Sequence, residues 1–147
     1  MKFWLKNTLR QAAWAPATVF ILYLIAKKVF NHTIIDPWLD ILAHVLGGFA
    51  ITYFYFIGFA HFHALHGLIP RLTHLALPVG LTAITAIVWE ILEYVSDSIF
   101  STKLAPSLSD SLSDQFCGLL GAFIFASLAA RSRGFFQLPT RDIGERG

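Results

Sequence analysis

The chain has 147 residues, of which 56% are hydrophobic and only 14% are charged, and its mean hydropathy is +0.62. Soluble domains contain about 25% charged residues, so this composition excludes an ordinary soluble domain and predicts a small membrane protein. The formal net charge is +2, and no basic stretch is interleaved with aromatic side chains. That pattern argues against a nucleic-acid partner. With Cys117 as the single cysteine, the chain cannot form an internal disulfide.

Four stretches without Asp, Glu, Lys or Arg mark the expected membrane spans. They cover residues 11–26, 41–70, 72–89 and 115–130. A helix that crosses a bilayer needs about 20 residues, so the shorter stretches must extend into their charged flanks. We therefore expect an all-α polytopic membrane protein whose four transmembrane helices form a small bundle. These helices are expected at residues 10–30, 37–60, 74–97 and 110–131.

The two ends of the chain are expected to differ in role. Lys2, Lys6 and Arg10 recur at every fourth residue and predict a short interfacial helical turn before the first span. No small-residue cleavage pattern follows Ala26, which favours a retained first span over a cleaved signal peptide. The expected organisation is a single transmembrane domain over residues 1–131, followed by a cytoplasmic tail over residues 132–147.

The distribution of basic residues predicts the orientation in the membrane. With four spans, the N-terminus, the connection near residue 71 and the C-terminal tail lie on one side. That side holds eight of the eleven basic residues, while the other side holds only Lys27, Lys28 and Lys103. The positive-inside rule therefore predicts that both termini are cytoplasmic.

The acidic residues gather at the opposite end of the predicted bundle. The chain has nine Asp and Glu residues, and seven of them fall near the outer ends of the second, third and fourth spans. These seven are Asp36, Asp40, Glu90, Glu93, Asp97, Asp110 and Asp114. Carboxylates that face lipid cost about 2.5–3.5 kcal/mol each at the membrane centre, so we expect them to face one another or a wet cavity.

Helical spacing places these acids in three stripes. Asp40 and His44 are four residues apart in the second span, and Asp110 and Asp114 are four residues apart in the fourth. Residues at this spacing lie on one face of a helix. Glu90, Glu93 and Asp97 follow the i, i+3, i+7 pattern in the third span and form the remaining stripe.

Carboxylates packed together repel one another unless protons, basic partners or bound cations compensate them. We therefore predict a divalent-cation site whose catalytic and ligating residues are Asp40, His44, Glu90, Glu93 and Asp114. Asp97 and Asp110 are expected as additional metal ligands. An oxygen-rich ligand set with one imidazole suits Mn, Fe, Mg or Ca better than a structural Zn. If the site is catalytic, the ion would polarise a phosphoryl or carbonyl oxygen of a lipid or cell-envelope precursor and activate water.

Other interpretations remain open at this point. Asp36 and Asp110 also suit helix N-caps, and Asp97 also suits a solvated helix end. The same stripes would serve a proton or cation relay in a small transporter. A third alternative is an accessory subunit that packs against a larger membrane complex. Membrane lipids are expected partners in every case, and the relay would require a homo-oligomer.

Three blocks of the sequence resemble a known group of proteins. The blocks are LDILAHVLGGF, WEILEYVSD and DSLSDQFCGLLGA, within residues 36–126. In this order they resemble the VanZ-like and YjdF-type bacterial inner-membrane proteins, and the third block lacks the Glu-x-x-Gln of the VanZ pattern. The resemblance implies a multi-pass protein of the bacterial cytoplasmic (inner) membrane. The positions that match are Asp40, His44, Glu90, Glu93, Asp110, Asp114 and Gly118.

Overall fold

The computed structural model describes residues 2–30, 36–66, 70–100 and 107–132, and every regular element in these ranges is an α-helix. The predicted all-α class is therefore confirmed for the described part of the chain. Except for Ser132, the predicted C-terminal tail lies outside the described residues. The helices are α1 (Lys2–Ala12), α2 (Trp14–Phe30), α3 (Asp36–His66), α4 (Arg71–Phe100) and α5 (Leu108–Arg131).

Three of these helices are long and apolar enough to cross a membrane. They are α4, α5 and the part of α3 from Trp38 to His63. Helices α1 and α2 pass the same test only as a pair, which is bent by 42°. By length and composition, the described residues therefore contain three candidate membrane spans, or four if the bent pair is one span. Helices α3 and α4 are longer than the spans expected at residues 37–60 and 74–97: α3 continues to His66 and α4 begins at Arg71.

The first expected span, residues 10–30, is divided at Ala13. Pro16 explains the division, because proline has no N–H for the carbonyl four residues earlier and its ring collides with that carbonyl. The carbonyl in question belongs to Ala12, the last residue of α1. The neighbouring hydrogen bonds persist, since the Ala17 N–H still donates to Ala13 O at 3.3 Å. The proline therefore bends the chain without separating α1 from α2.

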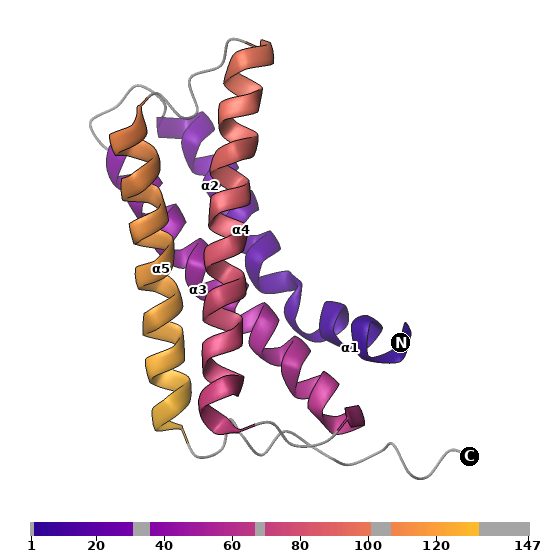
Figure 1. Cartoon of the computed structure of the whole chain (residues 1–147). Coiled ribbons are helices and arrows are strands. Elements are labelled where there is room, and N and C mark those ends of the chain that lie inside the picture. Colours follow the sequence, from indigo (N-terminus) through magenta and orange to yellow (C-terminus); the bar gives the residue numbers. More distant parts are fainter. Residues whose placement is uncertain (1, 31–35, 67–69, 101–106, 133–147) are drawn as a thin grey trace.

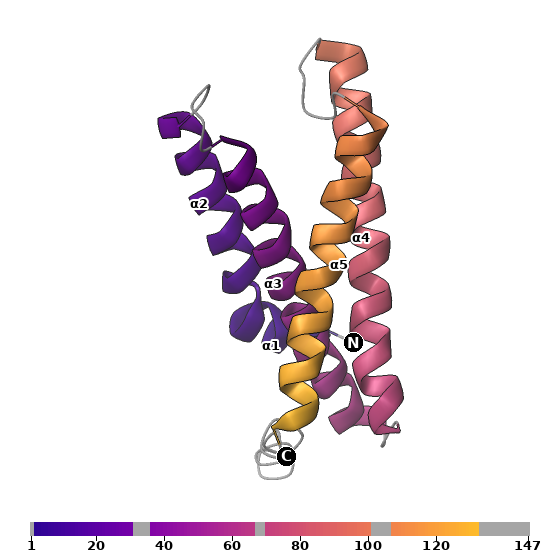
Figure 2. The ribbon, with the colours of Figure 1, turned by 90° about the vertical axis from the view of Figure 1, so that its left-hand side faces the viewer.

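Helix α3 is the centre of the bundle and packs against all four other described helices. Figure 1 shows α4 and α5 side by side in front of it, while α1 projects to the right. In Figure 2 the α2–α3 pair and the α4–α5 pair diverge toward the top. Helix α3 begins at this upper end, α4 ends there and α5 begins there. We call it the acidic end, because the seven Asp and Glu residues named above lie in the parts of these helices near it.

Glycines set the distance between α3 and α5. A Cβ placed on Gly48 would overlap the carbonyl oxygen of Gly118, and one placed on Gly121 would overlap the carbonyl oxygen of Val45. Only residues without a side chain permit backbones to approach so closely, as membrane helix pairs commonly do. Gly48 and Gly121 therefore permit the close contact between α3 and α5.

The apolar core lies in the half of the bundle away from the acidic end. Phe56 of α3 and Phe125 of α5 are 1% and 4% exposed, and their ring centroids are 5.6 Å apart. Phe49 packs edge-on against the same Phe125 ring at 5.2 Å. Ala12, Ile57 and Ala129 complete this cluster. The tight aromatic packing anchors one half of the bundle, and the acidic half is left with more space.

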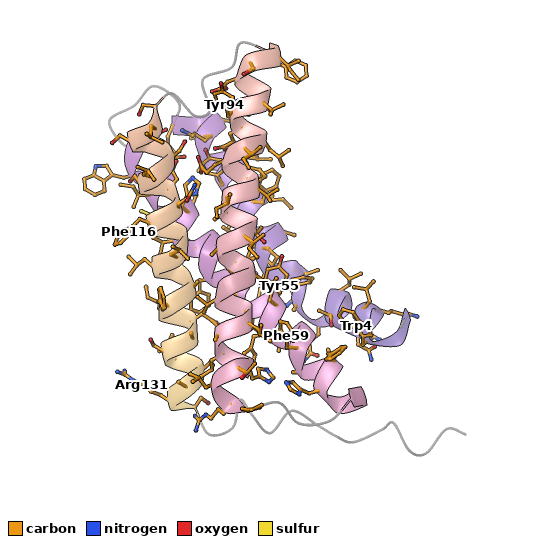
Figure 3. All side chains as sticks on the ribbon, in the orientation of Figure 1. Trp4, Tyr55, Phe59, Tyr94, Phe116 and Arg131 are labelled. Carbon is orange, nitrogen blue, oxygen red and sulfur yellow. The ribbon has the colours of Figure 1, made fainter. Side chains whose placement is uncertain are left out.

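The outward surface of the helices is apolar, as a bilayer requires. Helix α2 buries none of its residues, although most of its side chains are aliphatic or aromatic. Phe116 is 69% exposed and points away from the bundle on the outer side of α5 (Figure 3). Side chains of this kind would be unfavourable in water but are matched to lipid tails.

Candidate metal centre

Asp40, His44 and Asp114 form one compact group at the acidic end. One ligand atom from each residue lies within 4.8 Å of the corresponding atoms of the other two. His44 Nε2 is 3.6 Å from Asp114 Oδ2, and the side chain of Asp114 is only 6% exposed. We refer to these three residues as the triad. Two carboxylates and an imidazole are ligands that divalent cations accept.

Local geometry explains how two helices meet at the triad. Asp40 and His44 are four residues apart on α3 and therefore share one face. Asp114 comes from α5 and lies one turn before Gly118. A Cβ on Gly118 would be 3.9 Å from the carbonyl oxygen of His44. The close glycine contact between α3 and α5 thus continues directly into the triad and brings its third member within reach.

Helix α2 supplies two further groups to the triad. The Tyr23 hydroxyl donates a hydrogen bond of 2.9 Å to Asp40 Oδ1, and Lys27 Nζ is 3.9 Å from the same oxygen. The sequence analysis placed Lys27 on the same side of the membrane as the acids but missed Tyr23. The available signal was their spacing, because the two residues are four apart and therefore fall on the same face of α2. Asp40 of α3 is thus held by two side chains of α2.

Glu90 and Glu93 of α4 lie outside the triad. The Trp89 indole N–H donates a hydrogen bond of 2.8 Å to Glu93 Oε1. Glu90 is 7% exposed, and within the described residues no group offers a hydrogen bond to its Oε2. A buried carboxyl oxygen without a partner is costly unless a bound group compensates it.

A cavity of about 280 Å³ connects these glutamates to His44. It lies between α2, α3 and α4, and its walls are mostly aliphatic and aromatic. Its polar end is formed by Tyr23, His44, Glu90 and Glu93. The remaining lining is provided by Pro16, Val19, Phe20, Ala43, Gly47, Gly48, Ile51, Thr82, Thr85, Ala86, Trp89 and Gly118.

The other predicted acids are not part of the triad. Asp110 lies in the first turn of α5, and its backbone N–H donates to Ser107 Oγ at 3.2 Å. The N-cap of α5 is therefore Ser107, and the interpretation of Asp110 as the cap was wrong because the helix begins earlier than expected. Asp97 lies two turns beyond Glu90, close to the end of α4. Helix α3 begins at Asp36, as the Asp-Pro pair predicts, but the Asp36 side chain lies outside the described residues.

Comparison with known proteins gives a family but no characterised relative. No curated protein and no solved structure matches the chain. The family comparison gives no assignment to the VanZ-like or YjdF-type proteins, so that resemblance depends on the three sequence blocks alone. The match covers residues 2–134, almost the whole chain, and the family is described as "Predicted membrane protein (DUF2238)". Together with the apolar helices described above, this match shows that the chain is a membrane protein that belongs to the DUF2238 family.

Proposed function

We propose that this protein binds a divalent cation at Asp40, His44 and Asp114. The observation that supports this proposal is the placement of three ligand atoms within 4.8 Å of one another at the junction of α3 and α5. Metal–ligand distances of about 2.0–2.6 Å place two ligands of one ion roughly 3 to 5 Å apart. The separation of 3.6 Å between His44 Nε2 and Asp114 Oδ2 falls in this range. It is too long for a strong hydrogen bond.

The ligand set suggests which ion binds and what it does. Two carboxylates and one imidazole suit Mn or Fe best, and Mg or Ca next. Structural Zn is a poorer match, because its sites are closed by four protein ligands. Three protein ligands leave coordination positions for water and for a substrate oxygen. Held by Asp40, His44 and Asp114, such an ion would supply Lewis-acid polarisation of a phosphoryl or carbonyl oxygen of a lipid or envelope precursor. Glu90, Glu93, Asp97 and Asp110 are proposed to supply a base or additional ligands around it.

We also propose the setting of this site. A bacterial inner-membrane location with both termini cytoplasmic would place the acidic end at the outer face of the membrane. The bent α1–α2 pair would then be the first of four spans, which is consistent with the exposed apolar surface of α2. The same surface would also suit a homo-oligomer or a larger membrane complex.

Metal analysis tests the cation site. Purified protein dialysed against Mn²⁺ should retain about one equivalent per chain, and His44→Ala should lower the affinity at least 100-fold. This expectation follows because loss of even an outer-shell partner weakens metal binding about 10- to 100-fold. His61→Ala is the matched control, since His61 lies on the same helix and bonds to Gln11 rather than to the triad. Equal metal content in the wild type and His44→Ala would contradict the proposal.

A second candidate function is a proton relay, which the burial of Glu90 favours. Buried acids that face a cavity in a membrane protein commonly mark proton pathways. Proteoliposomes that contain the wild-type protein should then dissipate a pH gradient faster than empty liposomes do. Glu90→Gln, which cannot exchange a proton, should reduce the rate to that of empty liposomes. Equal rates for the two proteins would contradict the relay.

A further inference from the structure

The cavity beside the triad has the features of a second binding site. It contains His44 but neither Asp40 nor Asp114, so it shares one residue with the triad. Its volume of about 280 Å³ approaches the lower end of the 300–1,000 Å³ that is usual for small-molecule sites. Its apolar walls suit an organic molecule better than a hydrated ion.

The charged residues in the cavity lining favour a positively charged ligand. Glu90 and Glu93 line the cavity, and the lining contains neither Lys nor Arg. Glu90 is the critical group, because it is 7% exposed and no described residue pairs with its Oε2. An anionic occupant would be repelled, and a neutral apolar occupant would leave that oxygen buried without compensation. A positively charged group placed beside Glu90 would compensate it.

Aromatic side chains favour an organic ammonium group in particular. Phe20 of α2 and Trp89 of α4 meet edge to face, with ring centroids 5.9 Å apart, and both line the cavity. Rings of this kind attract ammonium groups through their π-faces, an interaction that strengthens away from water. The Trp89 N–H is already used by Glu93, so its ring face is the part that remains for a ligand.

The same two rings line the cavity and are also partly exposed at the surface of the molecule. The backbones of α2 and α4 are not in contact, so side chains alone span the space between the two helices. Phe20 is 46% exposed and Trp89 is 41% exposed. Rotation of these two side chains would admit a molecule laterally without movement of either backbone. A ligand that partitions into the bilayer could therefore reach Glu90.

We propose that the cavity between α2, α3 and α4 binds an organic ammonium cation with an apolar body. The ammonium group lies beside Glu90 and Glu93, and the apolar body lies against Val19, Ala86 and the Phe20–Trp89 pair. This site shares His44 with the triad, and the metal proposal also assigns Glu90 and Glu93 as a base or additional ligands. Its test is therefore carried out without metal.

Equilibrium dialysis of the full-length protein in an uncharged detergent tests the proposal. Radiolabelled benzyltrimethylammonium is the probe, because it is permanently charged and has a compact apolar ring. A chelator is present throughout, so that the outcome is independent of the triad. Binding should be saturable, should be absent for benzenesulfonate, and should weaken at least 10-fold in Glu90→Gln. Glu145→Gln removes the same charge from the C-terminal residues and should leave the affinity unchanged.

Gly47→Leu provides a second variant that keeps the charge and removes the space. Gly47 lines the cavity, and a Cβ placed on it meets no atom within 4 Å, so the larger side chain enters the cavity without a backbone collision. This variant should elute as the wild type does and should lose benzyltrimethylammonium binding. The proposal is overturned if the wild type shows no saturable binding. It is also overturned if Glu90→Gln and Gly47→Leu both bind the probe as the wild type does.

Discussion

Gly121→Val should prevent the protein from folding into a stable bundle. A Cβ at this position overlaps the Val45 carbonyl and would be 2.9 Å from the Phe49 backbone nitrogen. Overpacking that displaces only side chains lowers the free energy of unfolding by about 1–3 kcal/mol. A larger loss of stability is expected here, because backbone atoms must separate. Thermal unfolding in detergent, followed by circular dichroism and size-exclusion chromatography, measures the effect. The expected result is aggregation or loss of the cooperative transition.

Gly80→Ala is the control for that substitution. It adds the same first carbon to α4, at an exposed position where a Cβ meets nothing within 4 Å. Its transition temperature should match or slightly exceed that of the wild type, because alanine is a better helix former than glycine. If Gly121→Val unfolded at the same temperature as Gly80→Ala, the close approach of α3 and α5 would be refuted.

Asp114→Asn should abolish the stabilisation of the protein by divalent cations. A ligand that binds only the folded state stabilises it by about 2.7 kcal/mol when its concentration is 100 times Kd. The asparagine retains the volume of Asp114 but removes the buried charge that faces His44. Wild-type protein titrated with Mn²⁺ should therefore show a rising unfolding temperature, and the variant should show none at the same concentrations.

The controls for this experiment separate Mn²⁺ binding at the triad from the effect of removing one negative charge anywhere in the chain. Asp142→Asn removes an equal charge from the C-terminal residues and should preserve the Mn²⁺-dependent rise. Acidification of the wild-type sample should diminish the rise, because protons compete with metal for carboxylate and imidazole ligands. A rise of equal size in wild type and Asp114→Asn would rule out the triad as the ligand set.

The sequence was sufficient to predict α3, α4 and α5 and the residues that share a face within each of them, but not the division of the first expected span into α1 and α2. Apolar stretches located α3, α4 and α5, and the i, i+4 spacing alone placed Asp40 and His44 on one helical face. These features are local, so they depend only on helix geometry and on the polarity of the bilayer.

The contacts between different helices could not be predicted from apolar stretches and helical spacing. Asp114 reaches His44, whereas Glu90 faces the cavity, because Gly48 and Gly121 draw α5 toward α3 and no equivalent contact draws α4 toward the triad. Tyr23 was missed because its role depends on the angle of α2, which Pro16 changes at Ala13. Such angles arise from side-chain packing between distant segments, and a single sequence does not encode them in any periodic pattern.

Helix α2 has a mechanical consequence for both proposed sites. It buries none of its residues, yet Tyr23 bonds to Asp40 and Phe20 lines the cavity. Outward tilting of α2 would therefore disturb little tightly packed surface and would affect the two sites together. A fluorophore or spin label attached to this helix would report occupancy of either site as a change in its distance from α4.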